Sequence, residues 1–159
     1  MDERKEEAAA KLKKAIQRNV IGKLEAQKIS QLLPAMQAKQ IGLIGIGFDP
    51  DGVDEFVTGE FFKGDIYLDP EREVYHNLGL HRASKTKGIG SLFSSKFRHL
   101  AKETKQNNTG GNFKGDAWQN GGVFIVAKGG QLVFEHRQHV PTDQVDMNEL
   151  ARVLGVGIP

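Results

Sequence analysis

Apolar residues gather most densely near the C-terminal end of the chain, in two short runs on either side of a turn. The first run is Gly122–Ala127 (GVFIVA) and the second is Leu132–Phe134 (LVF). Between them, Lys128–Gln131 holds two adjacent glycines, which accept the positive φ angles of a tight turn. This pattern predicts an antiparallel β-hairpin at one margin of a sheet, with its second strand at the edge.

Upstream of the hairpin, short apolar runs alternate with stretches of helical periodicity. Apolar positions from Ile21 to Met36 recur at the helical spacing, with Pro34 tolerated only at a kink or near a helix end. The runs Ile41–Ile46 and Asp65–Leu68 predict strands, the first of them a buried parallel strand. Further helices are expected at 53–57, at 70–78, at 96–105, and at 147–154 behind an Asp146 cap.

The first 20 residues differ in composition from the rest of the chain. Acidic residues come first and basic residues follow, an order that complements the helix dipole, and Ala8–Ala10 between them favour helix. The apolar stripe is limited to Leu12, Ile16 and Val20. We expect an atypical N-terminal helix at 1–20, followed by a region 21–159 that forms one domain with it, because 159 residues is the size of a single domain.

Taken together, the expected elements indicate a fold class. Strands separated by helices, then an antiparallel hairpin and a terminal helix, are the element order of a thioredoxin-like α/β fold. In that fold a mixed sheet is flanked by helices on both sides.

Composition narrows the kind of protein. The chain has 22 basic and 20 acidic residues, and a net charge of +2 is too small to indicate nucleic-acid binding. The sequence contains no run of about 18 apolar residues, the length needed to span a bilayer, and no apolar signal segment follows Met1. We therefore expect a cytoplasmic protein without a membrane span. The sequence contains no cysteine, which excludes disulfides and thiol chemistry from this chain.

Few residues suggest a reaction centre or a metal site. His136 and His139 form an H-x-x-H pair, but no further ligand stands at metal-binding spacing, so no metal site is expected. The glycines at 45 and 47 lack the rest of a dinucleotide-binding fingerprint. The acidic residues at 49, 51 and 54 lack the spacing of a calcium loop, and turn chemistry explains them better.

Several longer blocks fill the chain from about Ala26 to Val156. They are LIGIG at 43–47, GEFFKGDIYLD at 59–69, YHNLG at 75–79 with Arg82, GNFKGD at 111–116, and QNGGVFIVAKGG at 119–130. In this order they resemble the peroxiredoxin-like 2 family, and most closely its prostamide/prostaglandin F synthase branch. The resemblance implies a thioredoxin-like fold, a cytosolic location, and reduction of peroxides or of endoperoxides such as prostaglandin H2, with NADPH as the indirect reductant.

The resemblance also implies that the redox centre is lost. Family members carry a C-x-x-C motif, after a central strand, at the start of the helix that here runs into Glu25–Ser30. Counted back from that helix, the two cysteines fall on Asn19 and Gly22. Neither a carboxamide nor glycine forms a thiolate, so attack on an O–O bond and resolution through a disulfide are unavailable. The preceding segment, Leu12–Arg18, lacks the apolar run of a central strand, which is therefore expected to be altered or missing.

One region is a candidate binding site. Trp118, Asn120, Gly121 and Gly122 fall on the part of a thioredoxin-like fold that usually faces the active site, which indicates a groove for a lipid peroxide or a protein partner. The alternative is that Trp118 caps the core and the glycines allow close packing.

These observations lead to one expected function and one alternative. We expect a peroxiredoxin-like 2 family member without catalytic residues, without a bound cofactor, and without the reductase activity of its parent family. The alternative is a non-catalytic binding or regulatory module that uses the same groove. Loss of the central strand would leave unpaired edges on the strands at 41–46 and 123–126, and a second copy of the chain could cover them.

Overall fold

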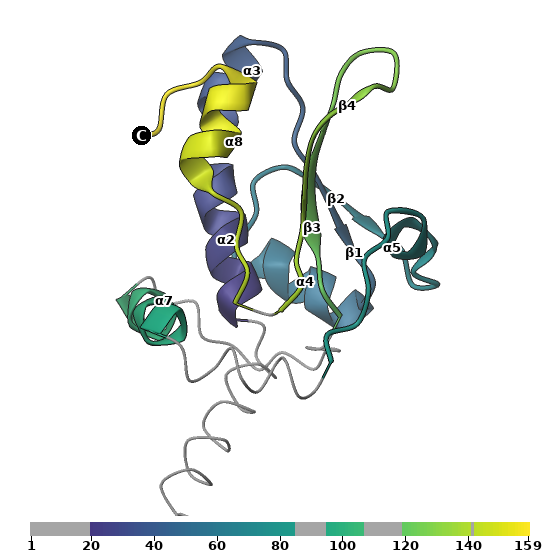
Figure 1. The fold of residues 1–159 in the computed structure, drawn as a ribbon, viewed down its shortest axis with the longest axis vertical. Coiled ribbons are helices and arrows are strands. Elements are labelled where there is room, and N and C mark those ends of the chain that lie inside the picture. The colour runs from purple at the N-terminus through teal and green to yellow at the C-terminus, as the bar shows by residue number, and fades with distance from the viewer. Residues whose placement is uncertain (1–19, 85–94, 107–118, 141) are drawn as a thin grey trace, which may run out of the picture.

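The computed structural model describes residues 20–84, 95–106, 119–140 and 142–159, which fold as helices and strands in α/β order (Figure 1). The helices are α2 (Val20–Ser30), α3 (Leu33–Ala38), α4 (Pro50–Thr58), α5 (Glu73–Asn77), α7 (Ser95–Gln106) and α8 (Met147–Leu154). The strands are β1 (Ile44–Gly47), β2 (Asp65–Leu68), β3 (Gly122–Val126) and β4 (Leu132–Arg137). The α/β class is confirmed, whereas the N-terminal helix expected up to residue 20 lies almost wholly outside the described residues.

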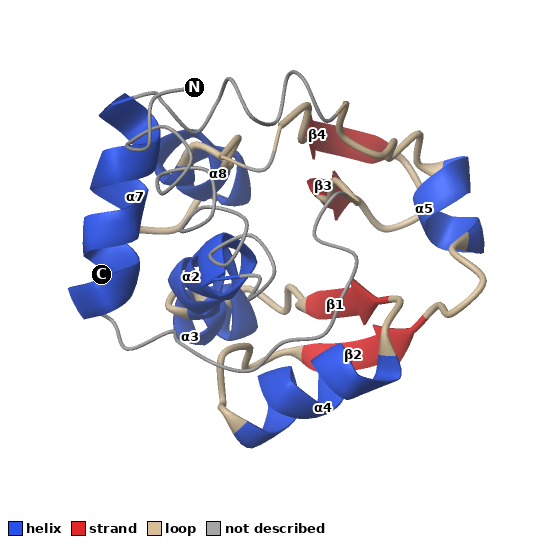
Figure 2. Cartoon of the chain, turned by 90° about the horizontal axis from the view of Figure 1, so that it is seen from below, coloured by secondary structure: helices blue, strands red, loops and turns tan. Residues whose placement is uncertain are grey.

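The strands form two separate two-stranded sheets. β1 and β2 pair in parallel, while β3 and β4 form the predicted antiparallel hairpin, with positive φ at Gly129 and Gly130 in its turn. Figure 2 shows the four strands in the order β4, β3, β1, β2, and no hydrogen-bonded ladder joins β3 to β1. Among the described residues no strand lies between these two, where the altered or missing central strand was expected.

The inner edge of β1 is therefore open in the described part of the chain. The Gly47 carbonyl accepts a hydrogen bond from the Asp69 N–H (2.7 Å), so Gly47 faces β2 and the backbone of Ile46 faces the other way. There the Tyr75 hydroxyl donates a hydrogen bond of 2.7 Å to the Ile46 carbonyl. The prediction that this strand is buried is wrong, since Ile44 is 59% exposed and Ile46 38%.

The exposure of these isoleucines follows from the alternation of side chains along a strand. A Cβ atom on Gly47 would meet Val53 of α4, so Gly47 and Gly45 face α4 and its flanking loop. Ile44 and Ile46 consequently point to the opposite face, where the short helix α5 lies (Figure 2).

One hydrophobic core packs against the hairpin and against Ile41 and Leu43, which lead into β1. In both views α2, α3 and α8 lie on one side of the strands, and α5 lies on the other (Figures 1 and 2). The strands contribute partly buried side chains that pack against this core, from Val123, Ile125 and Phe134. The buried centre of the core consists of Leu32, Met36, Val145, Leu150 and Leu154.

Local sequence signals predicted the start of α8 correctly but not the break between α2 and α3. As predicted, the Asp146 side chain caps α8 and accepts hydrogen bonds from the N–H groups of Asn148 (2.8 Å) and Glu149 (3.2 Å). Gly155 ends the helix at φ 66°. The helix predicted from Ile21 to Met36 is instead two helices, because the chain breaks after Ser30 and Pro34 stands in the first turn of α3.

The helix predicted from Pro70 is also shorter than expected. It begins only at Glu73, because Arg72 adopts a left-handed conformation (φ 58°) immediately before it. The Asp69 carboxylate accepts hydrogen bonds from the N–H groups of Glu73 (3.1 Å) and Val74 (2.9 Å) and so begins the helix in place of Pro70.

Candidate functional site

The start of α2 is the region where the family resemblance predicts the vacated redox motif. Gly22 lies in the first turn of this helix and is half-buried, while Asn19 lies outside the described residues. The next residue, Lys23, is fully buried, and its Nζ lies 2.5 Å from Oε1 of Glu55 and 4.9 Å from the centre of the Phe61 ring. An ion pair and a cation–π contact therefore anchor this end of α2 to α4 and the segment after it.

A half-buried polar cluster lies further along the same helix. The Glu25 carboxylate accepts hydrogen bonds from the Val145 N–H (2.8 Å) and the Gln138 side chain (3.3 Å). Burial raises the pKa of the Glu25 carboxyl above its ordinary range, and the Val145 hydrogen bond offsets part of that increase. Beside it, Nε2 of His136 lies 3.6 Å from the Asp143 carboxylate and has no hydrogen-bond partner among the described residues.

This cluster ties three distant segments together. Glu25 lies on α2, His136 and Gln138 lie on or just after β4, and Val145 precedes α8. Both oxygens of Glu25 already accept hydrogen bonds, so the carboxylate acts here as a structural cross-link. No local sequence signal indicates this role, because the hydrogen-bond partners of Glu25 are 113 and 120 residues away.

The residues of the predicted groove are held by backbone contacts where the structure describes them. Asn120 is only 4% exposed, and its N–H donates to the His81 carbonyl at 3.3 Å. Gly121 exchanges two hydrogen bonds with Gln138, of 2.9 and 3.0 Å, and Gly122 begins β3. Trp118 lies outside the described residues, so a groove formed with Trp118 stays a prediction.

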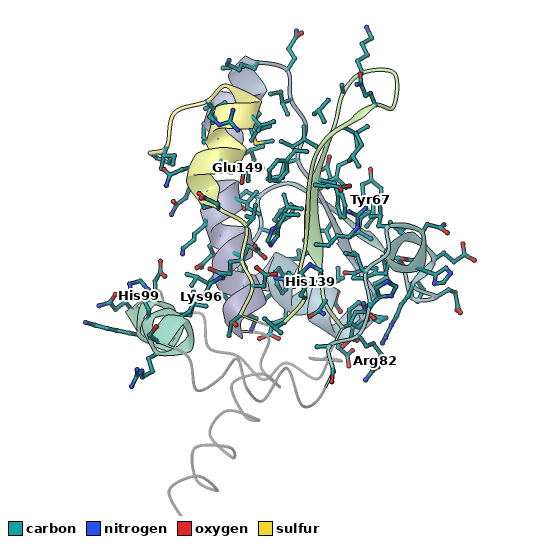
Figure 3. The ribbon with its side chains drawn as sticks, in the orientation of Figure 1. Tyr67, Arg82, Lys96, His99, His139 and Glu149 are labelled. Atoms are coloured by element: carbon teal, nitrogen blue, oxygen red, sulfur yellow. The ribbon has the colours of Figure 1, made fainter. Side chains whose placement is uncertain are left out.

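A depression that sequence reasoning missed lies between β4 and α8. It has a volume of about 580 Å³, and β4 forms one wall and the start of α8 the other. Its lining residues are Leu132, Val133, Phe134, Glu135, His136, Gln144, Val145, Asp146 and Glu149. Glu149 and His139 are labelled in Figure 3.

The described residues contain no group of three or more side chains able to hold a metal ion.

The Tyr75 hydroxyl has a pKa well above that of an ordinary tyrosine. Burial, with a smaller contribution from the Asp69 charge, raises the pKa of the Tyr75 hydroxyl to about 12. The hydroxyl donates to the Ile46 carbonyl at the open edge of β1, and the ring packs edge-on against Phe48 at 5.3 Å. The Tyr75 hydroxyl thus satisfies one carbonyl group of that edge.

This assignment predicts how stability changes at alkaline pH. The fold favours the protonated phenol, so its contribution is complete below pH ~10, the usual tyrosine pKa, and is lost as pH rises toward about 12. Tyr75→Phe is expected to show a shallower loss of unfolding free energy over that interval than the unmodified chain. Urea unfolding at several alkaline pH values measures this difference. Tyr67→Phe, at a side chain that is 59% exposed, should keep the unmodified slope, and equal slopes for Tyr75→Phe and the unmodified chain would contradict the assignment.

Comparisons with known proteins agree on one family. The family model described as AhpC/TSA antioxidant enzyme matches residues 28–140. Proteins named prostamide/prostaglandin F synthase from Danio rerio, Salmo salar and Homo sapiens are 39%, 38% and 33% identical to the chain over 132 residues. This region is 82% of the chain but 66% of the two fish proteins and 67% of the human one, so the chain spans about two thirds of the length of these relatives.

The family match does not reach the positions predicted for the vacated motif. The family match begins at residue 28, so it does not include Asn19 or Gly22. No solved structure matches the chain significantly. No helix of the described ranges is long and apolar enough to cross a bilayer.

Proposed function

Because this chain belongs to the AhpC/TSA antioxidant enzyme family, whose fold is thioredoxin-like, we propose that it is a member without thiol-based reduction that acts by binding. One observation carries the proposal: none of its 159 residues is a cysteine. A thiolate of lowered pKa is the nucleophile that attacks peroxide and disulfide bonds, and no other side chain replaces its combination of acidity and nucleophilicity.

Two hydroxyl groups in the described part of the chain are already engaged in hydrogen bonds, which supports this proposal. The Ser30 hydroxyl donates to the Ala26 carbonyl at 2.7 Å and accepts from the Lys63 N–H at 3.1 Å. The Tyr75 hydroxyl is used at the edge of β1. A hydroxyl becomes a nucleophile only beside a general base, and neither of these contacts supplies one.

The proposed ligands follow from the names of the relatives. A prostaglandin-type endoperoxide or another lipid peroxide is the small-molecule candidate, and its proposed site is the groove at Trp118, Asn120, Gly121 and Gly122. In such a family NADPH would serve only as an indirect reductant, so we propose no bound NADPH. Asn19 and Gly22 are the proposed vacated positions, and the proposed location is cytoplasmic. The inner edges of β1 and β3, which no strand of the described residues covers, are the proposed contact with a second copy.

A turnover assay tests the loss of reduction. The purified chain, supplied with NADPH, thioredoxin reductase and thioredoxin, is expected to consume no NADPH above the blank with prostaglandin H2 or hydrogen peroxide. The Danio rerio relative, 39% identical, serves as the positive control under the same conditions. Turnover by this chain at a rate comparable to the control would overturn the proposal.

A further inference from the structure

The Glu25 carboxylate holds two separate segments against α2. Its Oε1 accepts a hydrogen bond from the Val145 N–H just before α8 (2.8 Å), and its Oε2 accepts one from the side-chain amide of Gln138 just after β4 (3.3 Å). An ionised carboxylate has only acceptor sites, whereas protonation turns one of its oxygens into an O–H donor. The two contacts are therefore those of the ionised form of Glu25.

Gln138 extends this arrangement to the start of β3. Its side-chain oxygen accepts a hydrogen bond from the Gly121 N–H at 2.9 Å, so its NH2 group is turned toward Glu25. Turning the amide over would set the NH2 group against the Gly121 N–H and the oxygen against an ionised carboxylate. Only one orientation of the Gln138 amide thus satisfies both neighbours, and it requires an acceptor at Glu25.

A proton on Glu25 disturbs this arrangement at either oxygen. On Oε1 the new O–H would face the Val145 N–H, a backbone donor that cannot turn away. On Oε2 it would face the NH2 group of Gln138, at the longer of the two distances. The Gln138 amide can turn over and accept from this O–H, so we expect Oε2 to take the proton. The turned amide then offers no acceptor to the Gly121 N–H.

The surroundings of Glu25 make this protonation easier than at an exposed carboxylate. Desolvation raises the pKa of the Glu25 carboxyl above its ordinary value of 4.5, the backbone hydrogen bond described above offsets part of the increase, and Asp143 adds to it. His136 of β4 and Lys28 of α2 itself also lower this pKa, and Lys28 pairs with Glu103 of α7 at 2.8 Å. Glu25 therefore becomes neutral at a pH at which exposed carboxylates are still charged.

We propose that Glu25 and Gln138 form a proton-controlled switch between α2 and the start of β3. Ionised Glu25 keeps the oxygen of the Gln138 amide on the Gly121 N–H, and protonation of Glu25 turns the amide over and releases that N–H. Because folding raises the pKa of this carboxyl, its contribution to the unfolding free energy is complete below pH 4.5 and is lost as pH rises through the folded pKa. The switch is thus a rearrangement within the folded protein and not acid unfolding. It does not depend on whether the chain reduces peroxides.

Amide NMR on the full chain tests this switch during a titration from neutral to acidic pH. The Gly121 amide is expected to titrate with the same midpoint as the side-chain carboxyl carbon of Glu25, above pH 4.5. Exchange of the Gly121 N–H, corrected for its intrinsic pH dependence, should become about fivefold faster, as expected for the loss of one hydrogen bond. A Gly121 amide that does not titrate, or a Glu25 midpoint at or below 4.5, would overturn the proposal.

Two variants assign the titration to Glu25 and its transmission to Gln138. Glu25→Gln keeps the shape of the neutral acid, so Gly121 should exchange rapidly at neutral pH and show no titration. In Gln138→Leu the Glu25 carboxyl should still titrate while Gly121 no longer responds. Glu149→Gln, at an exposed residue of α8, is the matched control and should keep the titration of the unmodified chain. Titration of Gly121 that persists in Glu25→Gln or in Gln138→Leu would contradict the switch, because another group or another route would then be responsible.

Discussion

Glu55→Ala is expected to lower the free energy of unfolding by about 3 kcal/mol, because it leaves the charge of Lys23 buried without its carboxylate. The Lys23 side chain is 0% exposed and the Glu55 side chain 25%, with 2.5 Å between Nζ and Oε1. Breaking a buried ion pair from one side costs more than removing the pair, since the remaining charge stays away from water and has lost its carboxylate. The partial exposure of Glu55 places the expected cost at the lower end of the range for buried pairs.

Three variants distinguish this cause from general damage to α4. Lys23→Met, which removes the charge and keeps the length of the side chain, should destabilise the chain less than Glu55→Ala does. The double variant should resemble Lys23→Met. Asp54→Ala, at an exposed neighbour on α4, should change the free energy of unfolding by less than about 0.5 kcal/mol in urea. A loss for Glu55→Ala no larger than that of Asp54→Ala would show that the ion pair contributes little.

Leu150→Ala is expected to cost about 3 kcal/mol of unfolding free energy, within the range measured for leucine truncation in well-packed cores. Leu150 is 2% exposed and lies in the buried core with Leu32 and Met36, where α8 meets α3. Truncation there loses transfer free energy and leaves a cavity that the helices on either side cannot fill. Because the same core also packs against Val123 and Phe134, the variant should loosen the hairpin as well.

Denaturant unfolding and amide exchange together measure this effect. Exchange in β3 should quicken in Leu150→Ala in proportion to the loss of global stability. Ile158→Ala, at a side chain that is 51% exposed, is the matched truncation and should cost less than about 0.5 kcal/mol. A cost below about 1 kcal/mol for Leu150→Ala would mean that the core around α8 is loosely packed.

Elements whose signals are local were predicted well from the sequence. The paired glycines of Lys128–Gln131 placed the hairpin, and the bounds predicted for Asp65–Leu68 and Met147–Leu154 agree with β2 and α8. The blocks that resembled the peroxiredoxin-like family are likewise confirmed by the family match and by the named relatives. For the hairpin, β2 and α8, the deciding residues lie within a few positions of the structure that they determine.

Features that depend on distant pairing were not predictable. The exposure of Ile44 and Ile46 depends on which elements cover β1, and an apolar run looks the same whether or not it is covered. Glu25 joins segments more than 100 residues apart. The depression between β4 and α8 depends on how that helix packs against that strand. Local sequence carries no signal for such placements, because any charged residue of a helix could equally face solvent.

The division of the strands into two sheets has a consequence for the order of folding. The hairpin β3–β4 closes within residues 122–137, and β1 reaches β2 through the single crossover that contains α4. Isolated hairpins form within about 1–10 μs, so the β3–β4 sheet does not have to wait for a distant strand to arrive. We expect the slow step to be the docking of α2 against the segment before α8, which the Glu25–Val145 hydrogen bond completes across 120 residues. On this view the transition state is defined by helices that meet over two preformed sheets.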